Sequence, residues 1–99
     1  MRKRALIVHS DNSASILMEN WVRHEGYATR SVQTGNEAVS LALDNQVDLI
    51  VLDRSAPASE NVDVILGLMR HPRAARIPVL FVNADSDALP IISNSRRFH

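Results

Sequence analysis

Cysteine is absent from this chain of 99 residues, which excludes disulfides, thiolate nucleophiles and zinc–cysteine sites. Glycine is scarce, with 3 residues, so a phosphate-cradling loop that needs several glycines is not available. Neither sign of charge dominates, because 11 Lys and Arg balance 11 Asp and Glu, and this argues against nucleic-acid or membrane-surface partners held by bulk charge. The apolar run behind the basic start spans only residues 5–8, too short for a signal sequence or a membrane span. These absences favour a soluble, cytoplasmic protein.

Four short apolar runs are typical of β-strands: residues 5–8, 27–32, 47–52 and 78–82. Three are nearly continuous in apolar residues, which indicates strands covered on both faces, whereas residues 27–32 alternate and suit a sheet edge. Helical patterns lie between the runs. Apolar residues, Leu17 among them, recur at helical spacing over residues 13–25, before Gly26. A capping box at Thr34 and Glu37 predicts a second helix to about residue 45, and a third helix around residues 62–69 ends at Pro72.

This alternation of strands and helices predicts a single α/β domain with a mostly parallel sheet and helices on both faces. In such sheets ligands bind at the carboxyl ends of the strands. Polar residues follow each predicted strand at that edge, in the segments 9–11, 33–35, 53–55 and 83–85. We therefore expect the functional residues to lie in these four loops.

Five segments together resemble the receiver domains of bacterial response regulators. They are residues 6–8 with the polar cluster after them, 26–27, 34–39, 48–53 with Pro57 four positions on, and 77–82. Their order and spacing match that family over nearly the whole chain. The resemblance implies a flavodoxin-like (CheY-like) three-layer α/β sandwich with a parallel sheet in the order 2-1-3-4. It also implies that Asp53 accepts a phosphoryl group from a histidine kinase, and that Ser55 offers its backbone carbonyl to Mg²⁺. Such a domain is a switch rather than a turnover enzyme.

The pocket implied by the resemblance departs from the family at several positions. Where the family has two acidic residues after the first strand, this sequence has His9 and Ser10, which are poor ligands for Mg²⁺. Asp11 follows one residue late, so we expect at most a weakened magnesium site formed by Asp53, Asp11 and the Ser55 carbonyl. Asn83 stands where the family has a hydroxyl residue that senses the phosphoryl oxygen, and Ala84 follows it in the pocket.

His9 is open to three interpretations. It can be a metal ligand, an imidazolium that pairs with Asp53 in place of Mg²⁺, or an exposed loop histidine. Adjacent strand ends favour contact with Asp53, but the sequence does not decide among the three.

The sequence is also shorter than a family member, which continues through a fourth helix, a fifth strand with a lysine beside the phosphoryl site, and a fifth helix. We expect a receiver-like domain over residues 1–84, and a remnant of the fourth helix or an extended tail over residues 85–99. Without a final strand and helix, the edge strand from Pro78 to Val82 and the uncovered face of the sheet favour a homodimer.

Two functions follow from these observations. The first is a phosphorelay receiver that uses Asp53 as its phosphoryl acceptor. The alternative is a degenerate pseudo-receiver that serves as a phosphorylation-independent interaction or dimerisation module. A flavin or nucleotide binder on this fold is disfavoured, because no glycine-rich or hydroxyl-rich phosphate loop follows the first strand. The partner expected for either function is a histidine kinase or another signalling protein, with no direct contact to nucleic acid or membrane.

Overall fold

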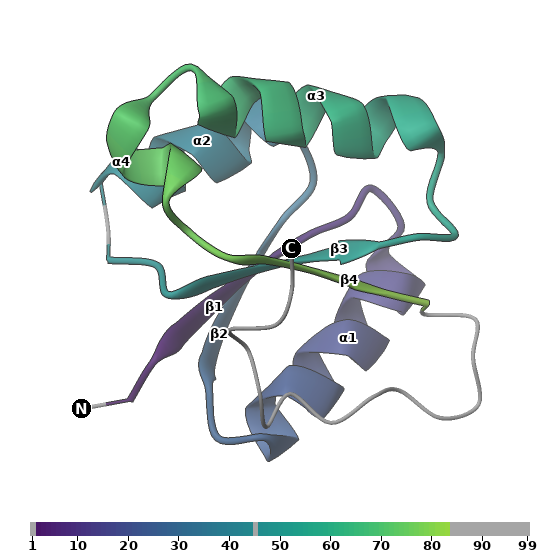
Figure 1. Cartoon of the computed structure of the whole chain (residues 1–99). Helices are drawn as coiled ribbons and strands as arrows, with labels where there is room; N and C mark the ends of the chain where they lie inside the picture. The colour runs from purple at the N-terminus through teal and green to yellow at the C-terminus, as the bar shows by residue number, and fades with distance from the viewer. Residues whose placement is uncertain (1, 45, 84–99) are drawn as a thin grey trace.

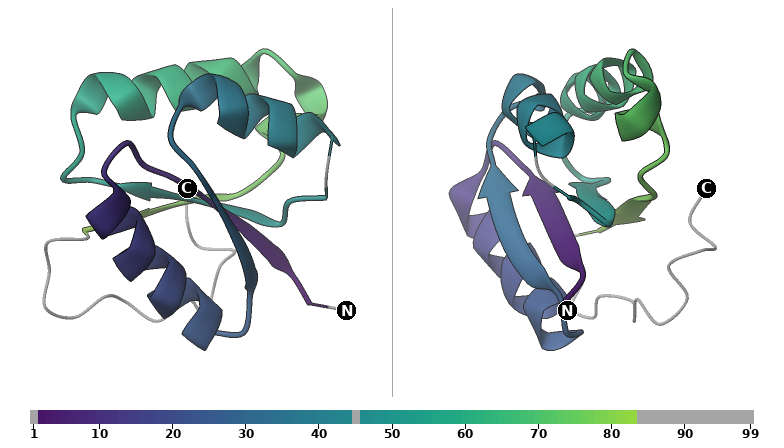
Figure 2. Two further views of the ribbon diagram at one scale, coloured as in Figure 1. Left: turned by 180° about the vertical axis from the view of Figure 1, so that it is seen from behind. Right: turned by 90° about the vertical axis from the view of Figure 1, so that its left-hand side faces the viewer.

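The computed structural model describes residues 2–44 and 46–83, which form a four-stranded sheet between helices (Figure 1). The elements are β1 (Arg4–Val8), α1 (Asn12–His24), β2 (Ala28–Val32), α2 (Gly35–Asp44), β3 (Leu49–Asp53), α3 (Ala58–Met69), α4 (Pro72–Ala75) and β4 (Val79–Val82). Helix α1 covers one face of the sheet, and α2, α3 and α4 cover the other, as the views in Figure 2 show. The chain therefore has the three layers that its alternating pattern predicts.

All strand pairs are parallel, and the strand order is β2-β1-β3-β4, which confirms the predicted sheet. The central strands β1 and β3 are buried on both faces, in keeping with their continuous apolar sequences. Strand β2 has the alternating sequence and lies at an edge, as predicted. Because β1 and β3 are neighbours, the loops that follow them meet at one end of the sheet.

The core has two halves, one on each face of the sheet. Ala5 and Ile7 of β1 point toward α1 and pack with Met18 and Val22. The alternate residues of β1 point toward α2 and α3 and pack in the other half with their buried apolar residues. A side-chain period of two residues along each strand thus divides the core between the helical layers.

Local sequence signals fix the helix ends. The Asp11 carboxylate caps α1 by accepting hydrogen bonds from the backbone amides of Ser13 and Ala14. After α1 the chain turns at Gly26, whose φ of 96° lies in the left-handed region that glycine adopts readily. At the start of α2, the Glu37 amide donates to the Thr34 hydroxyl as predicted, but the Glu37 carboxylate accepts from that hydroxyl instead of from the Thr34 amide.

The structure differs from the sequence predictions at some helical positions. Leu17 belongs to the predicted buried stripe of α1 but is 47% exposed. The short helix α4 was not predicted. Helix α3 ends at Met69, shortly before Pro72, and Pro72 is the first residue of α4, because proline suits the first turn of a helix. Ala84 and the predicted C-terminal segment 85–99 lie outside the described residues. No helix in the described part of the chain has the length and hydropathy needed to span a membrane.

Candidate functional site

Asp53 is the last residue of β3 and lies in the central part of the sheet, with β1 on one side and β4 on the other. Its side chain is 2% exposed, although it is acidic. A buried carboxylate needs several hydrogen-bond donors to compensate for the loss of water. Donors from two segments meet that need here, and they define the site.

The first donor is His9, which directly follows β1. Its Nε2 lies 2.7 Å from Asp53 Oδ2, in a contact that buries both side chains. Its Nδ1 accepts a hydrogen bond of 3.0 Å from the backbone amide of Asp11. A ring nitrogen that accepts carries no proton, so the hydrogen bonds assign a neutral imidazole with its proton on Nε2. His9 thus donates a charge-assisted hydrogen bond to the carboxylate.

The other donors come from the loop after β3. Oδ1 of Asp53 accepts from the Ser55 amide at 2.9 Å and from the Ser55 hydroxyl at 2.7 Å. The contact between an Asp side chain and the amide two residues on is an Asx turn, a local structure that this sequence favours. Each carboxylate oxygen of Asp53 therefore has at least one donor, and the group is held in one orientation.

Helix α3 supports the loops on either side of this pair. The Asn61 side-chain amide donates to the Asp53 carbonyl oxygen at 2.8 Å, and the Ser10 hydroxyl donates to Glu60 Oε1 at 2.6 Å. Beside His9, an open cavity of about 270 Å³ is lined by residues of the loops after β1 and β2 and of the first turns of α3. His9 is one of the residues that line this space.

These donors do not fit a magnesium ion as they are arranged. Mg²⁺ prefers carboxylate oxygens in octahedral geometry, and Asp53 already directs both oxygens to protein donors. His9 and Ser10 bring no negative charge, and Oδ1 of Asp11 is engaged in capping α1. Within residues 2–44 and 46–83 no group of three or more His, Asp or Glu side chains could hold a metal ion.

The structure brings together only some of the predicted site residues. His9, Asp53 and Ser55 are in direct contact, and Ser10 is joined to α3. His9 is 7% exposed, so it is not an exposed loop histidine, and its Asp53 contact is that of a neutral ring rather than an imidazolium. Asn83 is exposed at the end of β4, and Ala84 lies outside the described residues.

Sequence reasoning missed the contributions of Glu60 and Asn61. Both lie in the first turns of α3, and no local pattern links Glu60 to Ser10, fifty positions away, or Asn61 to the Asp53 carbonyl. The hydrogen bonds from Ser55 had a signal, because an acidic residue followed two positions later by serine favours an Asx turn.

No protein-family model matches the sequence. Individual proteins do match it. The chain is 26% identical over 92 residues to the "DNA-binding response regulator MtrA" of Mycobacterium tuberculosis, a match that covers 93% of this chain and 39% of that protein. It is 35% identical over 81 residues to the "DNA-binding dual master transcriptional regulator RpaA" of Synechocystis, covering 82% of this chain and 34% of that one. The chain thus spans about two fifths or less of these relatives.

Solved structures have the same fold. CheY4, a chemotaxis response regulator of Vibrio cholerae, superposes with a TM-score of 0.69 at 18% identity over 82% of this chain and 68% of that one. The signal receiver domain of a putative LuxO repressor protein of Vibrio parahaemolyticus gives a TM-score of 0.66 at 27% identity over 82% and 61%. The sequence relatives, these neighbours and the order of the sheet together identify the chain as a response-regulator receiver domain.

Proposed function

We propose that this receiver domain takes part in two-component signalling with Asp53 as its phosphoryl acceptor and a histidine kinase as the donor. The position and orientation of the Asp53 carboxylate carry the proposal. The carboxylate ends a central strand, at the edge where open parallel sheets place their functional loops. Donors on both oxygens hold it in one orientation, and a nucleophile that is already oriented loses less entropy when it reacts.

The proposed transfer uses Oδ2 of Asp53. When His9 turns away, its hydrogen bond to Oδ2 breaks while Ser55 still holds Oδ1. Oδ2 then attacks the phosphorus of the phosphohistidine in the kinase, a P–O bond forms, and the P–N bond breaks. The kinase imidazole leaves with the electron pair of that bond. The acyl phosphate adds charge beside the loops after β3 and β4, where exposed Asn83 is our candidate for the residue that responds.

A second candidate function is phosphorylation-independent interaction, which is favoured by one observation. Asp53 is 2% exposed and is bonded by His9, whose neutral ring stands at one of the two positions where the family has acidic residues. If His9 never leaves, the domain stays in one state and acts as a constitutive binding module. Magnesium does not enter either proposal, because the present donors do not fit it.

Self-association is part of the proposal for either function. Strand β4 has one neighbouring strand within the described residues, and its outer edge runs along the segment from Pro78 to Val82. An open parallel edge can pair with another strand, and a two-fold dimer satisfies both copies at once. Analytical ultracentrifugation is expected to show a dimer, and a monomer at all concentrations would contradict this part of the proposal.

The acceptor role is tested by incubating the protein with a small acyl-phosphate donor and measuring the intact mass. The wild type is expected to gain one phosphoryl group that the Asp53→Asn variant does not gain. A His9→Asp/Ser10→Asp variant, assayed with Mg²⁺, serves as the reactive control because it restores the acidic pair of the family. A folded wild type that stays unmodified while this control reacts would refute the acceptor role and leave the second candidate.

A further inference from the structure

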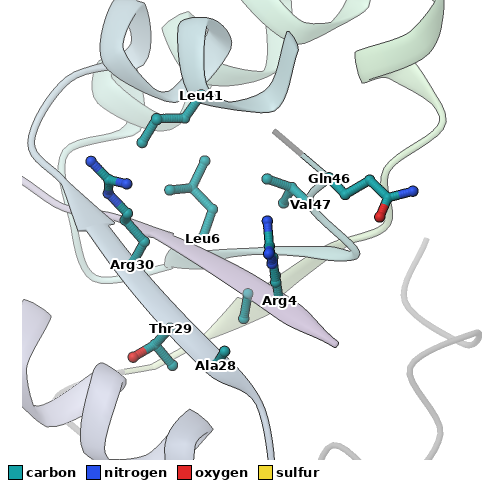
Figure 3. Close-up of a pocket in the computed structure, with 9 residues that line it drawn as sticks. Arg4, Leu6, Ala28, Thr29, Arg30, Leu41, Gln46 and Val47 are labelled. Carbon is teal, nitrogen blue, oxygen red and sulfur yellow. The ribbon is translucent and has the colours of Figure 1, made fainter. Parts of the chain in front are cut away.

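A groove that is separate from the Asp53 site runs along β2, where the edge of the sheet meets α2 (Figure 3). We call it the β2 groove. It is an open cavity of about 300 Å³, and the residues that matter for the argument are Arg4, Leu6, Arg30, Leu41 and Val47. In Figure 3, Leu6 lies between the two arginines, with Leu41 of α2 above it and Val47 between Leu6 and Gln46. The groove therefore combines an apolar floor with two cationic groups.

Within residues 2–44 and 46–83, neither arginine of the groove has an acidic partner. Arg30 is in register with Leu6 on the neighbouring strand, so both side chains point to the α2 side of the sheet. Asp48 accepts from the backbone amide of Arg4, not from its guanidinium. Across the described residues, no carboxylate lies within ion-pairing distance of either guanidinium. The groove thus has positive charge available for an anionic occupant.

The backbone of β2 adds a second recognition element. Ala28 and Val32 direct hydrogen bonds toward β1, through the amide of Ala28 and the carbonyl of Val32. By the alternation of a parallel ladder, the amides and carbonyls of Thr29 and Ser31 point to the open edge. The edge between these two residues continues into a shallow groove lined by Arg30, Val32, Leu41 and polar residues of α2, among them Glu37, whose carboxylate accepts a hydrogen bond from Thr34. An extended peptide bound along this edge would form hydrogen bonds with the backbone of β2, and every second side chain of the peptide would point toward α2.

We propose that the β2 groove binds an extended acidic segment of a partner protein by adding it as a fifth strand to the sheet. The segment carries Asp or Glu opposite Arg30, and apolar residues two positions away on the same face. The acidic side chain meets Arg30, and the apolar ones cover the partly exposed Leu41. Backbone hydrogen bonds to Thr29 and Ser31 supply affinity, and the pockets supply specificity.

A second copy of this chain fits the same edge less well. Two β2 strands paired antiparallel about a two-fold axis, with Thr29 opposite Ser31, would place Arg30 directly opposite its own copy. Like charges in directly opposed positions destabilise a sheet, whereas opposite charges stabilise it. The charge of the edge thus selects an acidic partner over self-pairing.

The test uses a fluorescently labelled peptide, Val-Thr-Glu-Thr-Val, and its matched control, Val-Thr-Lys-Thr-Val, in anisotropy titrations with the full chain. The wild type is expected to bind the Glu peptide about tenfold more tightly than the Lys peptide. Arg30→Glu is expected to reverse this preference, because Arg30 is exposed and its replacement leaves the core intact. Arg73→Glu, the same charge change at an exposed position of α4, is expected to keep the wild-type preference.

Amide exchange locates the bound peptide. The amides of Thr29 and Ser31 are expected to exchange with solvent several-fold more slowly in the complex. Three results would overturn the proposal: equal binding of the two peptides, a preference that Arg30→Glu leaves unchanged, or binding without protection at these two amides. Self-association that is lost on disrupting the β2 edge would show that a second copy occupies the groove instead.

Discussion

The hydrogen bond between His9 and Asp53 is expected to contribute strongly to stability. It joins a neutral donor to a carboxylate that is 2% exposed, over 2.7 Å. A hydrogen bond to a charged group contributes about 1.5–3 kcal/mol, and a buried acceptor that loses its donor is not fully compensated by water. We therefore expect His9→Ala to lower the free energy of unfolding by about 2–3 kcal/mol. For a domain of about this size, this corresponds to a fall in Tm of about 10 °C or more.

The assay is urea denaturation of four proteins: wild type, His9→Ala, Asp53→Ala and the double variant. Fluorescence of Trp21, which packs against the α1 half of the core, reports unfolding. This double-mutant cycle separates the interaction energy of His9 and Asp53 from the packing energy lost in each single variant. We expect a coupling energy of about 1.5–2.5 kcal/mol. His71→Ala is the matched control, because His71 makes no side-chain capping bond, and its effect should stay within about 0.5 kcal/mol.

A coupling energy below about 0.5 kcal/mol would show that His9 and Asp53 do not stabilise each other, because the effects of two substitutions add when the residues do not interact. The same result would remove the basis for a site held closed by His9.

Three further predictions concern the Asp53 site and the packing of α2 against α3. In ¹⁵N NMR spectra, His9 should show its proton on Nε2, and a proton on Nδ1 would contradict the assigned hydrogen bonds. Mg²⁺ should leave the Tm of the wild type unchanged. It should stabilise His9→Asp/Ser10→Asp by about 2.7 kcal/mol when the Mg²⁺ concentration is a hundred times the Kd. A rise in the Tm of the wild type with Mg²⁺ would show that its site does accept the ion. Gly67→Ala should destabilise by about 1 kcal/mol in denaturation experiments despite the better helix propensity of alanine, because its Cβ would lie 2.8 Å from Val39 Cγ2, and a more stable variant would show that the contact between α2 and α3 relaxes easily.

Most of the fold could be predicted from the sequence because its signals are local. Continuous apolar strands, helical spacing and Gly26 each act over a few residues, and the crossover rule then leaves few topologies. Two details were wrong for physical reasons. Leu17 fits the helical period but lies at the margin of the buried face, which is formed by Ser15, Met18 and Val22, and is 47% exposed. Pro72 reads as a stop signal, and the sequence does not reveal that it also begins α4.

Less of the site could be predicted, because it depends on contacts between distant segments. Strand-end adjacency correctly placed His9 near Asp53. It did not determine the proton on Nε2, which depends on the amide of Asp11. Asp11 itself was a candidate metal ligand, but its carboxylate caps α1, a role that its position before an amphipathic helix also indicates.

In the proposed function, Asp53 is a phosphoryl acceptor whose Oδ2 accepts a hydrogen bond from His9. The most direct test is the rate at which an acyl-phosphate donor modifies the wild type and His9→Ala, followed by intact mass at a temperature where both are folded. Both proteins are expected to be modified at Asp53, and His9→Ala is expected to react about tenfold to a hundredfold faster, because a hydrogen bond of about 1.5–3 kcal/mol no longer has to break. An unmodified protein in both cases, or a slower reaction in folded His9→Ala, would contradict the proposed function.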